Sequence, residues 1–381
     1  MNQVEDNQSP RIRFDLAELA GSMGDFGTIL PLVLAVALVS GLDIGYIFLF
    51  FGIWFIISGV IYRLPVPVEP MKAIAVIAIA EALSPDEIAA AGILLGLIFL
   101  FFSIGGWMNA LKKWMPESVI RGIQLGLALL LLKTSAGFLL EDPLYFGLGL
   151  AVILVLYFIS RWRGIPDVSS LLLIGIALGA GIFLNGVPKI VLLSAPQLVL
   201  PNPGAFLPAL TILVIPQALL TLTNAILATS LLSRDLFAIE IKPARLSRTI
   251  GLMNLISVPF GGLPMCHGAG GMAAQYRFGA RTGGANIIAG GILLILALFF
   301  ASPAIVGLIS VGIYGALLVF VALELGQHAK KTDSLAVTLV IGILTLATSM
   351  TIAFLAGLVL AYILNYAKKS RRREHMENTE R

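Results

Sequence analysis

The residues best suited to chemistry in this chain surround a break in an apolar segment, 64-LPVPVEPMKAIA-75. Glu69 and Lys72 stand three positions apart within it, and three prolines precede Lys72. Proline lacks an amide donor and biases the residue before it toward extended backbone, so a continuous helix cannot pass through this segment. A helix that begins at Pro70 leaves its first amides unpaired, namely those of Met71, Lys72 and Ala73. Together with the Lys72 ammonium, such amides favour the binding of an anion.

A second break, 263-LPMCHGAGGMAA-274, has a similar character. Its proline is followed by Cys266 and His267, and helix resumes near Met272. The glycines between them permit unusual backbone angles and close approach by a ligand: Gly268, Gly270 and Gly271. Non-helical backbone at membrane depth is tolerated only where protein or a water-filled cavity surrounds it, so both breaks are expected to line a cavity. Cys266 and His267 lack a third metal ligand, which favours a neutral imidazole that donates to substrate or backbone.

Other polar residues stand where a spanning helix would be apolar: Asp25, Gln217, Thr221, Thr223 and Asn224. Ionisable groups inside a membrane are costly and therefore functional by default. We interpret Asp25 as a residue of substrate binding or proton coupling, with a hydrogen bond between helices as the alternative. For Glu69 and Lys72, the alternative is a neutral pair that only fixes the break.

The elements that must position these residues are membrane-spanning helices. Hydrophobic residues make up 58% of the 381 positions and charged residues 12%, against roughly 25% charged in soluble domains. Apolar runs are long enough to cross about 30 Å of hydrocarbon. We predict fourteen spans, at 16–40, 44–62, 64–82, 87–108, 117–138, 143–160, 168–187, 206–231, 246–260, 263–280, 285–301, 303–325, 335–348 and 349–367. The polar first seventeen residues do not resemble a cleavable signal peptide, and the single Cys266 excludes an internal disulfide.

Lysine and arginine mark one side of the membrane. They occur in alternate loops from Arg13 to 368-KKSRRR-373, whereas the opposite loops hold only Lys189 and several acids. The positive-inside rule then places both tails, 1–15 and 368–381, in the cytoplasm, with the protein in the plasma membrane. The net charge of +4 is explained by this topology. We therefore expect membrane lipid as a partner and no nucleic acid.

An internal repeat relates the two breaks. Shifting the sequence by 199 residues without a gap places 90-AAGILLGLIFLFFS-103 over 289-AGGILLILALFFAS-302. The same shift places one break over the other and Asp25 over Asn224. Apolar spans resemble one another by composition, but three anchors at one shift indicate a duplication.

The repeat predicts how the halves are arranged. Repeat one covers 16–187, an extracellular linker covers 188–205, and repeat two covers 206–367. Because each repeat has seven spans, an odd number, the second copy is inverted, as in secondary transporters whose substrate site lies between the halves. The two half-helices then face each other, and their N-termini with Lys72 make a site suited to an anion.

Four motifs carry a resemblance to a known family: 24-GDFGTILP-31, 65-PVPVEPMKAIA-75, 216-PQALLTLTNA-225 and 264-PMCHGAGGMAAQYRFGARTGG-284. From about residue 14 to 366, the sequence closely resembles the molybdate transporter family, a relative of the SulP-type sulfate permeases. The resemblance implies an all-α, seven-plus-seven inverted-repeat fold shared with the uracil transporters. It further implies a core domain of spans 1–4 and 8–11, a gate domain of spans 5–7 and 12–14, and an elevator-like movement of the core.

Two departures from the SulP pattern bear on the site. SulP proteins usually append a cytoplasmic STAS domain, whereas only about fifteen polar residues follow the last predicted span here, so regulation by such a domain is not expected. SulP proteins commonly carry a basic residue at the position that aligns with Gly271, and this chain has Lys72 at the repeat-equivalent position. If the charge has moved in this way, the oxyanion is held by Lys72, backbone of both half-helices and nearby donors: Met71, Ala73, Gly268, Gly270, Gly271, His267, Gln275, Gln217, Thr221 and Asn224. Asp25 and Glu69 are then candidates for proton coupling, since a carboxylate beside a bound anion takes up a proton more readily.

We therefore expect a proton-coupled secondary transporter that imports a tetrahedral oxyanion without a cofactor. Molybdate is the first expectation, with sulfate or tungstate next. A proton-coupled nucleobase transporter would favour a carboxylate in the eighth span, where Asn224 stands. An anion channel and a homodimer are further open alternatives. A membrane enzyme is least favoured, because Asp25, Cys266 and His267 do not form a motif that places a nucleophile beside a base.

Overall fold

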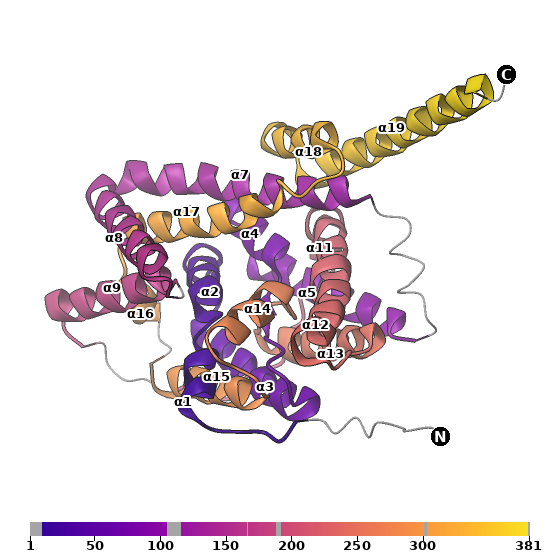
Figure 1. Cartoon of the computed structure of the whole chain (residues 1–381). Helices are drawn as coiled ribbons and strands as arrows, with labels where there is room; N and C mark the ends of the chain where they lie inside the picture. Colours follow the sequence, from indigo (N-terminus) through magenta and orange to yellow (C-terminus); the bar gives the residue numbers. More distant parts are fainter. Residues whose placement is uncertain (1–9, 105–115, 166, 188–191, 301–302, 380–381) are drawn as a thin grey trace, which may run out of the picture.

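The computed structural model describes residues 10–104, 116–165, 167–187, 192–300 and 303–379. The described chain is mostly helical (Figure 1), which confirms the predicted all-α class. Parts of several predictions lie outside these residues: the end of the fourth span at 105–108, residues 188–191 of the linker with Lys189, residues 301–302 at the end of the eleventh span and of the repeat motif, residues 1–9 of the N-terminal tail and residues 380–381 of the C-terminal tail.

The first repeat contains seven predicted segments, and two of them are broken. Its elements are α1 (Leu16–Ser22), α2 (Phe26–Ser40), α3 (Ile44–Tyr62), β1 (Glu69–Pro70), α4 (Lys72–Glu81), α5 (Pro85–Phe102), α7 (Glu117–Glu141), α8 (Pro143–Arg163) and α9 (Ser169–Asn185). The predicted first span divides at residues 23–25, which places Asp25 immediately before α2. The predicted third span is extended through β1 and helical only in α4.

The second repeat begins with one long helical stretch from Pro203 to Phe237. It comprises η1 (Pro203–Ala205), α10 (Phe206–Ala209), η2 (Leu210–Val214), α11 (Ile215–Leu220), η3 (Thr221–Ala228) and α12 (Thr229–Phe237). Both η2 and η3 are wider π turns. Pro216 cannot donate to the preceding turn, which accounts for the departure from regular α-helix at η2.

The remaining elements include the second broken segment. They are α13 (Pro243–Ser257), η4 (Val258–Phe260), β2 (Met265–Cys266), α14 (Ala269–Arg277), α15 (Gly284–Ile295), η5 (Leu296–Phe300), α16 (Pro303–Val306), α17 (Val311–His328), α18 (Leu335–Ala347) and α19 (Met350–Thr379). The predicted twelfth span is interrupted between α16 and α17. The apolar part of α19 ends at Tyr366, close to the predicted end of the last span at residue 367, but the helix itself continues through the polar residues to Thr379. Residues 367–379 contain no glycine or proline, and most are good helix formers.

Six helical stretches of the described chain are long and apolar enough to cross a membrane: Leu16–Ser40, Ile44–Tyr62, Pro85–Phe102, Glu117–Glu141, Pro143–Arg163 and Pro203–Phe237. Shorter apolar helices occur at Ser169–Asn185, Gly284–Phe299, Val311–Gln327, Leu335–Ala347 and Met350–Tyr366. With the half-helices α4 and α14 and the more polar α13, these helices correspond to the predicted segments.

The helices form two packed groups. In one, α7 packs along α17 and α18, α8 packs against α9 and α17, and α18 packs against α19 (Figure 1). In the other, α3 packs on α15, α5 on α13, α1 on α15 and α2 on α4. The two groups meet where α2 contacts α17 and where α4 contacts α7. The broken segments belong to the second group, close to this boundary.

Candidate substrate-binding site

The two breaks meet in a short antiparallel ribbon. Glu69 pairs with Cys266 and Pro70 with Met265, and the Met71 N–H donates to the Pro264 carbonyl at 2.9 Å. Inversion of one repeat relative to the other predicts this antiparallel meeting. The ribbon brings the N-termini of α4 and α14 together from opposite directions.

Side chains from neighbouring helices satisfy the extended backbone. The Asn254 amide both donates to the Met265 carbonyl (2.7 Å) and accepts from its N–H (2.9 Å), so it takes the place of a further strand. On the other break, the Ser58 hydroxyl donates to the Val66 carbonyl at 2.6 Å, and the Asn286 amide donates to the same oxygen. Buried backbone groups without partners are costly, so these side chains allow non-helical chain at this depth.

His267 fastens one break to the other. Its Nδ1 lies 2.8 Å from the Pro67 carbonyl, and its Nε2 lies 2.8 Å from the Thr249 hydroxyl. Because a carbonyl only accepts, Nδ1 carries the hydrogen of the bond to Pro67. The Tyr62 hydroxyl lies 2.6 Å from the same Thr249 oxygen. The buried imidazole therefore bonds to backbone and does not line the cavity described next.

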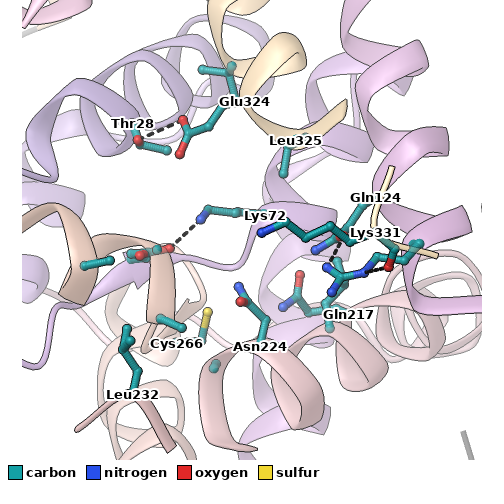
Figure 2. Close-up of a pocket in the computed structure, with 18 residues that line it drawn as sticks. Thr28, Lys72, Gln124, Gln217, Asn224, Leu232, Cys266, Glu324, Leu325 and Lys331 are labelled. Atoms are coloured by element: carbon teal, nitrogen blue, oxygen red, sulfur yellow. Dashed lines mark hydrogen bonds and ion pairs between the residues drawn. The ribbon is translucent and has the colours of Figure 1, made fainter. Parts of the chain in front are cut away.

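A cavity of about 400 Å³ lies between the two half-helices and the helices α2, η3, α7 and α17. Figure 2 shows Lys72 and Asn224 directed into it from different elements, with Glu324 above them and Gln124 and Lys331 at one end. Its charged and polar lining comprises Thr28, Glu69, Lys72, Arg121, Gln124, Gln217, Asn224, Glu324 and Lys331. Ala269 and Gly270, the first residues of α14, also line it.

Glu69 joins the two half-helices electrostatically. Its Oε2 lies 2.7 Å from the Lys72 ammonium, and its Oε1 accepts a hydrogen bond of 3.0 Å from the Gly271 N–H in the first turn of α14. A Cβ built on Gly268 or Gly271 would overlap the Glu69 carboxylate, and at Gly271 it would also overlap Asp25. Only glycine at these two positions leaves room for the carboxylates.

Gln217 covers the other helix N-terminus. Its Oε1 accepts from the Ala73 N–H at 2.8 Å and from the Ile74 N–H at 3.3 Å, while its Nε2 donates to the Thr221 hydroxyl at 2.8 Å. The expectation that the helix begins at Pro70 with unpaired amides is therefore wrong. Pro70 is held in the ribbon, α4 begins at Lys72, and the Met71 and Ala73 amides both have partners.

The structure brings only some of the predicted residues to the cavity wall. Lys72, Glu69, Gln217, Asn224 and Gly270 line it, whereas five others do not: Met71, Ala73, Thr221, His267 and Gln275. The Gln275 amide instead donates to Asn286 at 3.1 Å in the interior. Gly268 and Gly271 lie directly behind the Glu69 carboxylate.

Asp25 lies beside this wall. It is buried, and its Oδ2 has no hydrogen-bond partner among the described residues. Within the part of the chain that the structure describes, no cluster of three or more His, Cys, Asp or Glu side chains is arranged to hold a metal ion.

Two parts of the cavity were not predicted from the sequence. Glu324 of α17 lines it and accepts a hydrogen bond from the Thr28 hydroxyl at 3.1 Å. The signal for Glu324 was available, since it is an acid within the apolar run 319-VFVALELGQH-328. Arg121 lines the far end, held by Glu117 at 2.8 Å and by the Lys331 carbonyl at 3.0 Å.

Comparison with known proteins agrees with this architecture. Residues 17–131 and 209–325 match the family described as "Molybdate transporter of MFS superfamily". Molybdate transporter 1 of Arabidopsis thaliana is 34% identical over 414 aligned positions, which cover 93% of this chain and 90% of the relative. Molybdate transporter 2 of the same plant is 31% identical, covering 91% of this chain and 87% of the relative.

Solved structures give the fold. The transmembrane domain of the cyanobacterium bicarbonate transporter BicA superposes with a TM-score of 0.66 at 17% identity, over 92% of this chain and 99% of that one. The murine Slc26a9 anion transporter superposes with a TM-score of 0.69 at 14% identity, over 94% of this chain and 70% of that one. These likenesses show the inverted-repeat fold alone. The family match and the two plant relatives show that the chain belongs to the molybdate transporter family, as a multi-pass membrane transporter of anions and not an enzyme.

Proposed function

We propose that the protein transports molybdate, which binds in the cavity beside Lys72 at the meeting point of α4 and α14. The observation that carries this proposal is the largely enclosed Lys72 ammonium, which lies on the cavity wall together with the first turn of α14. An ammonium and a helix N-terminus both attract a dianion. The plant relatives that share the sequence are named as molybdate transporters.

In the proposed complex, oxygens of the substrate contact Lys72 and the backbone N–H groups in the first turn of α14, whose Ala269 and Gly270 line the cavity and whose Gly271 N–H is held by Glu69 when the site is empty. The Asn224 and Gln217 amides also line the cavity and offer further donors. These groups recognise charge and tetrahedral shape, which tungstate and sulfate share with molybdate. The ranking among the three oxyanions is therefore a matter for measurement.

We further propose that the two packed groups of helices move against each other. The group of α1–α5 and α10–α15 would be the core that carries the substrate, and the group of α7–α9 and α16–α19 the gate. The Thr28–Glu324 hydrogen bond joins α2 of the first group to α17 of the second. This bond would break and re-form as the core slides.

The cavity leads toward the side on which the basic loops lie. A second cavity of about 300 Å³ shares Arg121, Gln124 and Asn224 with the first, and it extends the polar path past Glu117. The lysines and arginines of these loops support a cytoplasmic position for this side. We propose that the described conformation is open to the cytoplasm, in the plasma membrane, with both termini inside.

Proton coupling is the last part of the proposal. Asp25 has an unpaired buried carboxylate oxygen, and Glu69 lies between Lys72 and α14. We propose that these two carboxyl groups exchange a proton as the anion enters and leaves, which would drive uptake by the proton gradient.

Uptake into proteoliposomes tests the function. The purified protein should accumulate labelled molybdate, more strongly with an inward proton gradient, and unlabelled tungstate and sulfate should be compared as competitors. Lys72→Gln should abolish uptake, while Lys242→Gln, which changes an exposed lysine in a loop, should not. Uptake of uracil and of no oxyanion would contradict the proposal. Flux that does not saturate would indicate a channel.

A further inference from the structure

We infer that Glu69 is a built-in competitor of the oxyanion: in the empty site its carboxylate occupies the positions of two substrate oxygens and must leave them when the substrate binds. The inference rests on the proposed function and adds which group occupies the substrate-binding positions when the site is empty.

The first argument is geometric. One oxygen of Glu69 lies 2.7 Å from the Lys72 ammonium, and the other accepts from the Gly271 N–H at 3.0 Å. These are the cation and the helix N-terminus that would attract the substrate. A carboxylate that bridges them presents two anionic oxygens to the same two groups as one edge of a tetrahedral oxyanion would. The substrate can therefore bind to the Lys72 ammonium and the Gly271 N–H together only after Glu69 has left them.

The second argument is that the surrounding chain leaves a place for this carboxylate. The N-cap residue of α14 is Gly268, which has no side chain to cap the helix. Glu69 supplies that cap from the opposite repeat, and a side chain at either Gly268 or Gly271 would overlap it. The carboxylate is buried on the protein side but lines the cavity on the other. It thus has open space into which it can rotate when displaced.

Two other carboxylates serve as internal controls. Asp25 and Glu324 both lie near enough to interact with the charge of Lys72. Neither forms an ion pair with Lys72, and Glu324 is bonded instead to Thr28. Neutralising either one changes the local field without vacating the bridging position. A general effect of negative charge would therefore appear in all three neutral variants, whereas competition appears only at Glu69.

The alternative is that Glu69 is a positioning residue that holds Lys72 ready for the substrate. The two roles predict opposite signs. A competitor weakens binding, so its removal tightens it, whereas loss of a positioning residue loosens it. Displacement of a charge-assisted hydrogen bond costs enough to change affinity by about tenfold or more.

The test is a dissociation constant for molybdate, measured by calorimetry at one fixed pH on purified protein in detergent. Glu69→Gln should bind at least about tenfold more tightly than the wild type. Asp25→Asn and Glu324→Gln should change affinity much less. Glu69→Asp keeps the charge but is too short to bridge both groups, so it should also bind more tightly. In proteoliposomes, Glu69→Gln should transport molybdate more slowly despite tighter binding, because no carboxylate then competes with the bound molybdate for Lys72 and promotes its release.

Unchanged or weaker binding by Glu69→Gln would overturn the inference, and so would equal tightening in all three neutral variants. Size-exclusion profiles and unfolding temperatures establish that each variant is folded. The glutamine of Glu69→Gln retains an oxygen that can accept from the Gly271 N–H, so this variant should fold. The affinity of Glu69→Asp gives a second, independent test of competition. If the wild type binds molybdate and Lys72→Gln does not, the proposed function stands even when Glu69→Gln has no effect. If neither the wild type nor Glu69→Gln binds any of molybdate, tungstate or sulfate, the proposed function falls as well.

Discussion

Replacing Lys72 should separate its contribution to folding from its contribution to the substrate. The side chain of Lys72 is 15% exposed and that of its partner Glu69 is 2% exposed. Water can therefore solvate little of the charge that remains when one partner is removed. Removing one partner of a buried pair costs about 3–5 kcal/mol, since the other charge is left uncompensated. Glu69 retains the Gly271 hydrogen bond, so we expect Lys72→Gln to lose about 3 kcal/mol of stability, at the lower end of that range.

The effect on binding is measured in a background without the competing charge. In Glu69→Gln, the substrate keeps Lys72, and in Lys72→Gln/Glu69→Gln it does not. A charge-assisted hydrogen bond contributes about 1.5–3 kcal/mol, so the second variant should bind molybdate about 10- to 150-fold more weakly than the first. Its stability should return toward that of the wild type, because neither charge is left alone.

Two measurements on four proteins complete the cycle: wild type, both single variants and the double variant. Thermal unfolding without ligand gives the coupling between the two side chains in folding. Calorimetric titration with molybdate gives their coupling in binding. The reasoning is refuted if the double variant binds molybdate as tightly as Glu69→Gln, for then Lys72 does not touch the substrate. It is also refuted if Lys72→Gln is as stable as the wild type, because the Glu69 carboxylate that remains would then not be left without a compensating charge.

Three further changes probe the surroundings of the site. Gly271→Ala should abolish uptake, because its Cβ overlaps the carboxylates of Asp25 and Glu69. Gly291→Ala should leave uptake unchanged, since no atom lies within 4 Å of a Cβ added there. Equal uptake by both variants would contradict the argument from crowding. Gln217→Ala should lower the free energy of unfolding by about 1–3 kcal/mol, because two buried amides at the start of α4 lose their acceptor, and an unchanged unfolding temperature would show that water replaces it. Glu324→Gln and Thr28→Val should alter the turnover rate, because the hydrogen bond between these side chains joins α2 to α17, while the molybdate dissociation constant stays within about threefold. A large change in affinity with normal turnover would place the pair in the binding site instead.

The breaks in the two half-helices could be predicted from the sequence because the signal is local. Prolines at 65, 67 and 70 and glycines at 268, 270 and 271 act on their own backbone, whatever surrounds them. Their meeting follows from the inverted repeat, since related segments of opposite direction approach along the pseudo-twofold axis. The ribbon between β1 and β2 is the structural result.

The partners of the helix N-termini could not be predicted in the same way. Which side chain caps α4 depends on how η2 and α11 pack, and Gln217 reaches the Ala73 amide across 144 positions of sequence. The start of α4 was misplaced for a related reason. Proline is favoured at a first helical position, but pairing of Pro70 with Met265 holds it in extended backbone and delays the helix to Lys72.

His267 shows how a residue type can mislead about a site. A lone imidazole between a cysteine and glycines suggested a donor to the substrate or to the backbone, and both hydrogen bonds go to the protein. Glu324 was not predicted for the opposite reason, because α17 is continuous around it and no break in the helix marks its position. Its place opposite Lys72 follows only from the packing of α17 on α2.

The pairing of Lys72 with Glu69 also bears on how an empty carrier could return. An unpaired ammonium would make movement of the core through the membrane costly, since a buried charge needs a partner. Both members of the pair lie on the same segment, from β1 to the start of α4, so the pair moves as one unit with no net charge. When the dianion displaces Glu69, the site gains negative charge that Lys72 alone does not balance. A proton taken up by Glu69 or Asp25 would offset part of it, which ties the proposed proton coupling to the same displacement. Substrate entry and protonation are then two parts of one exchange at the Lys72 ammonium.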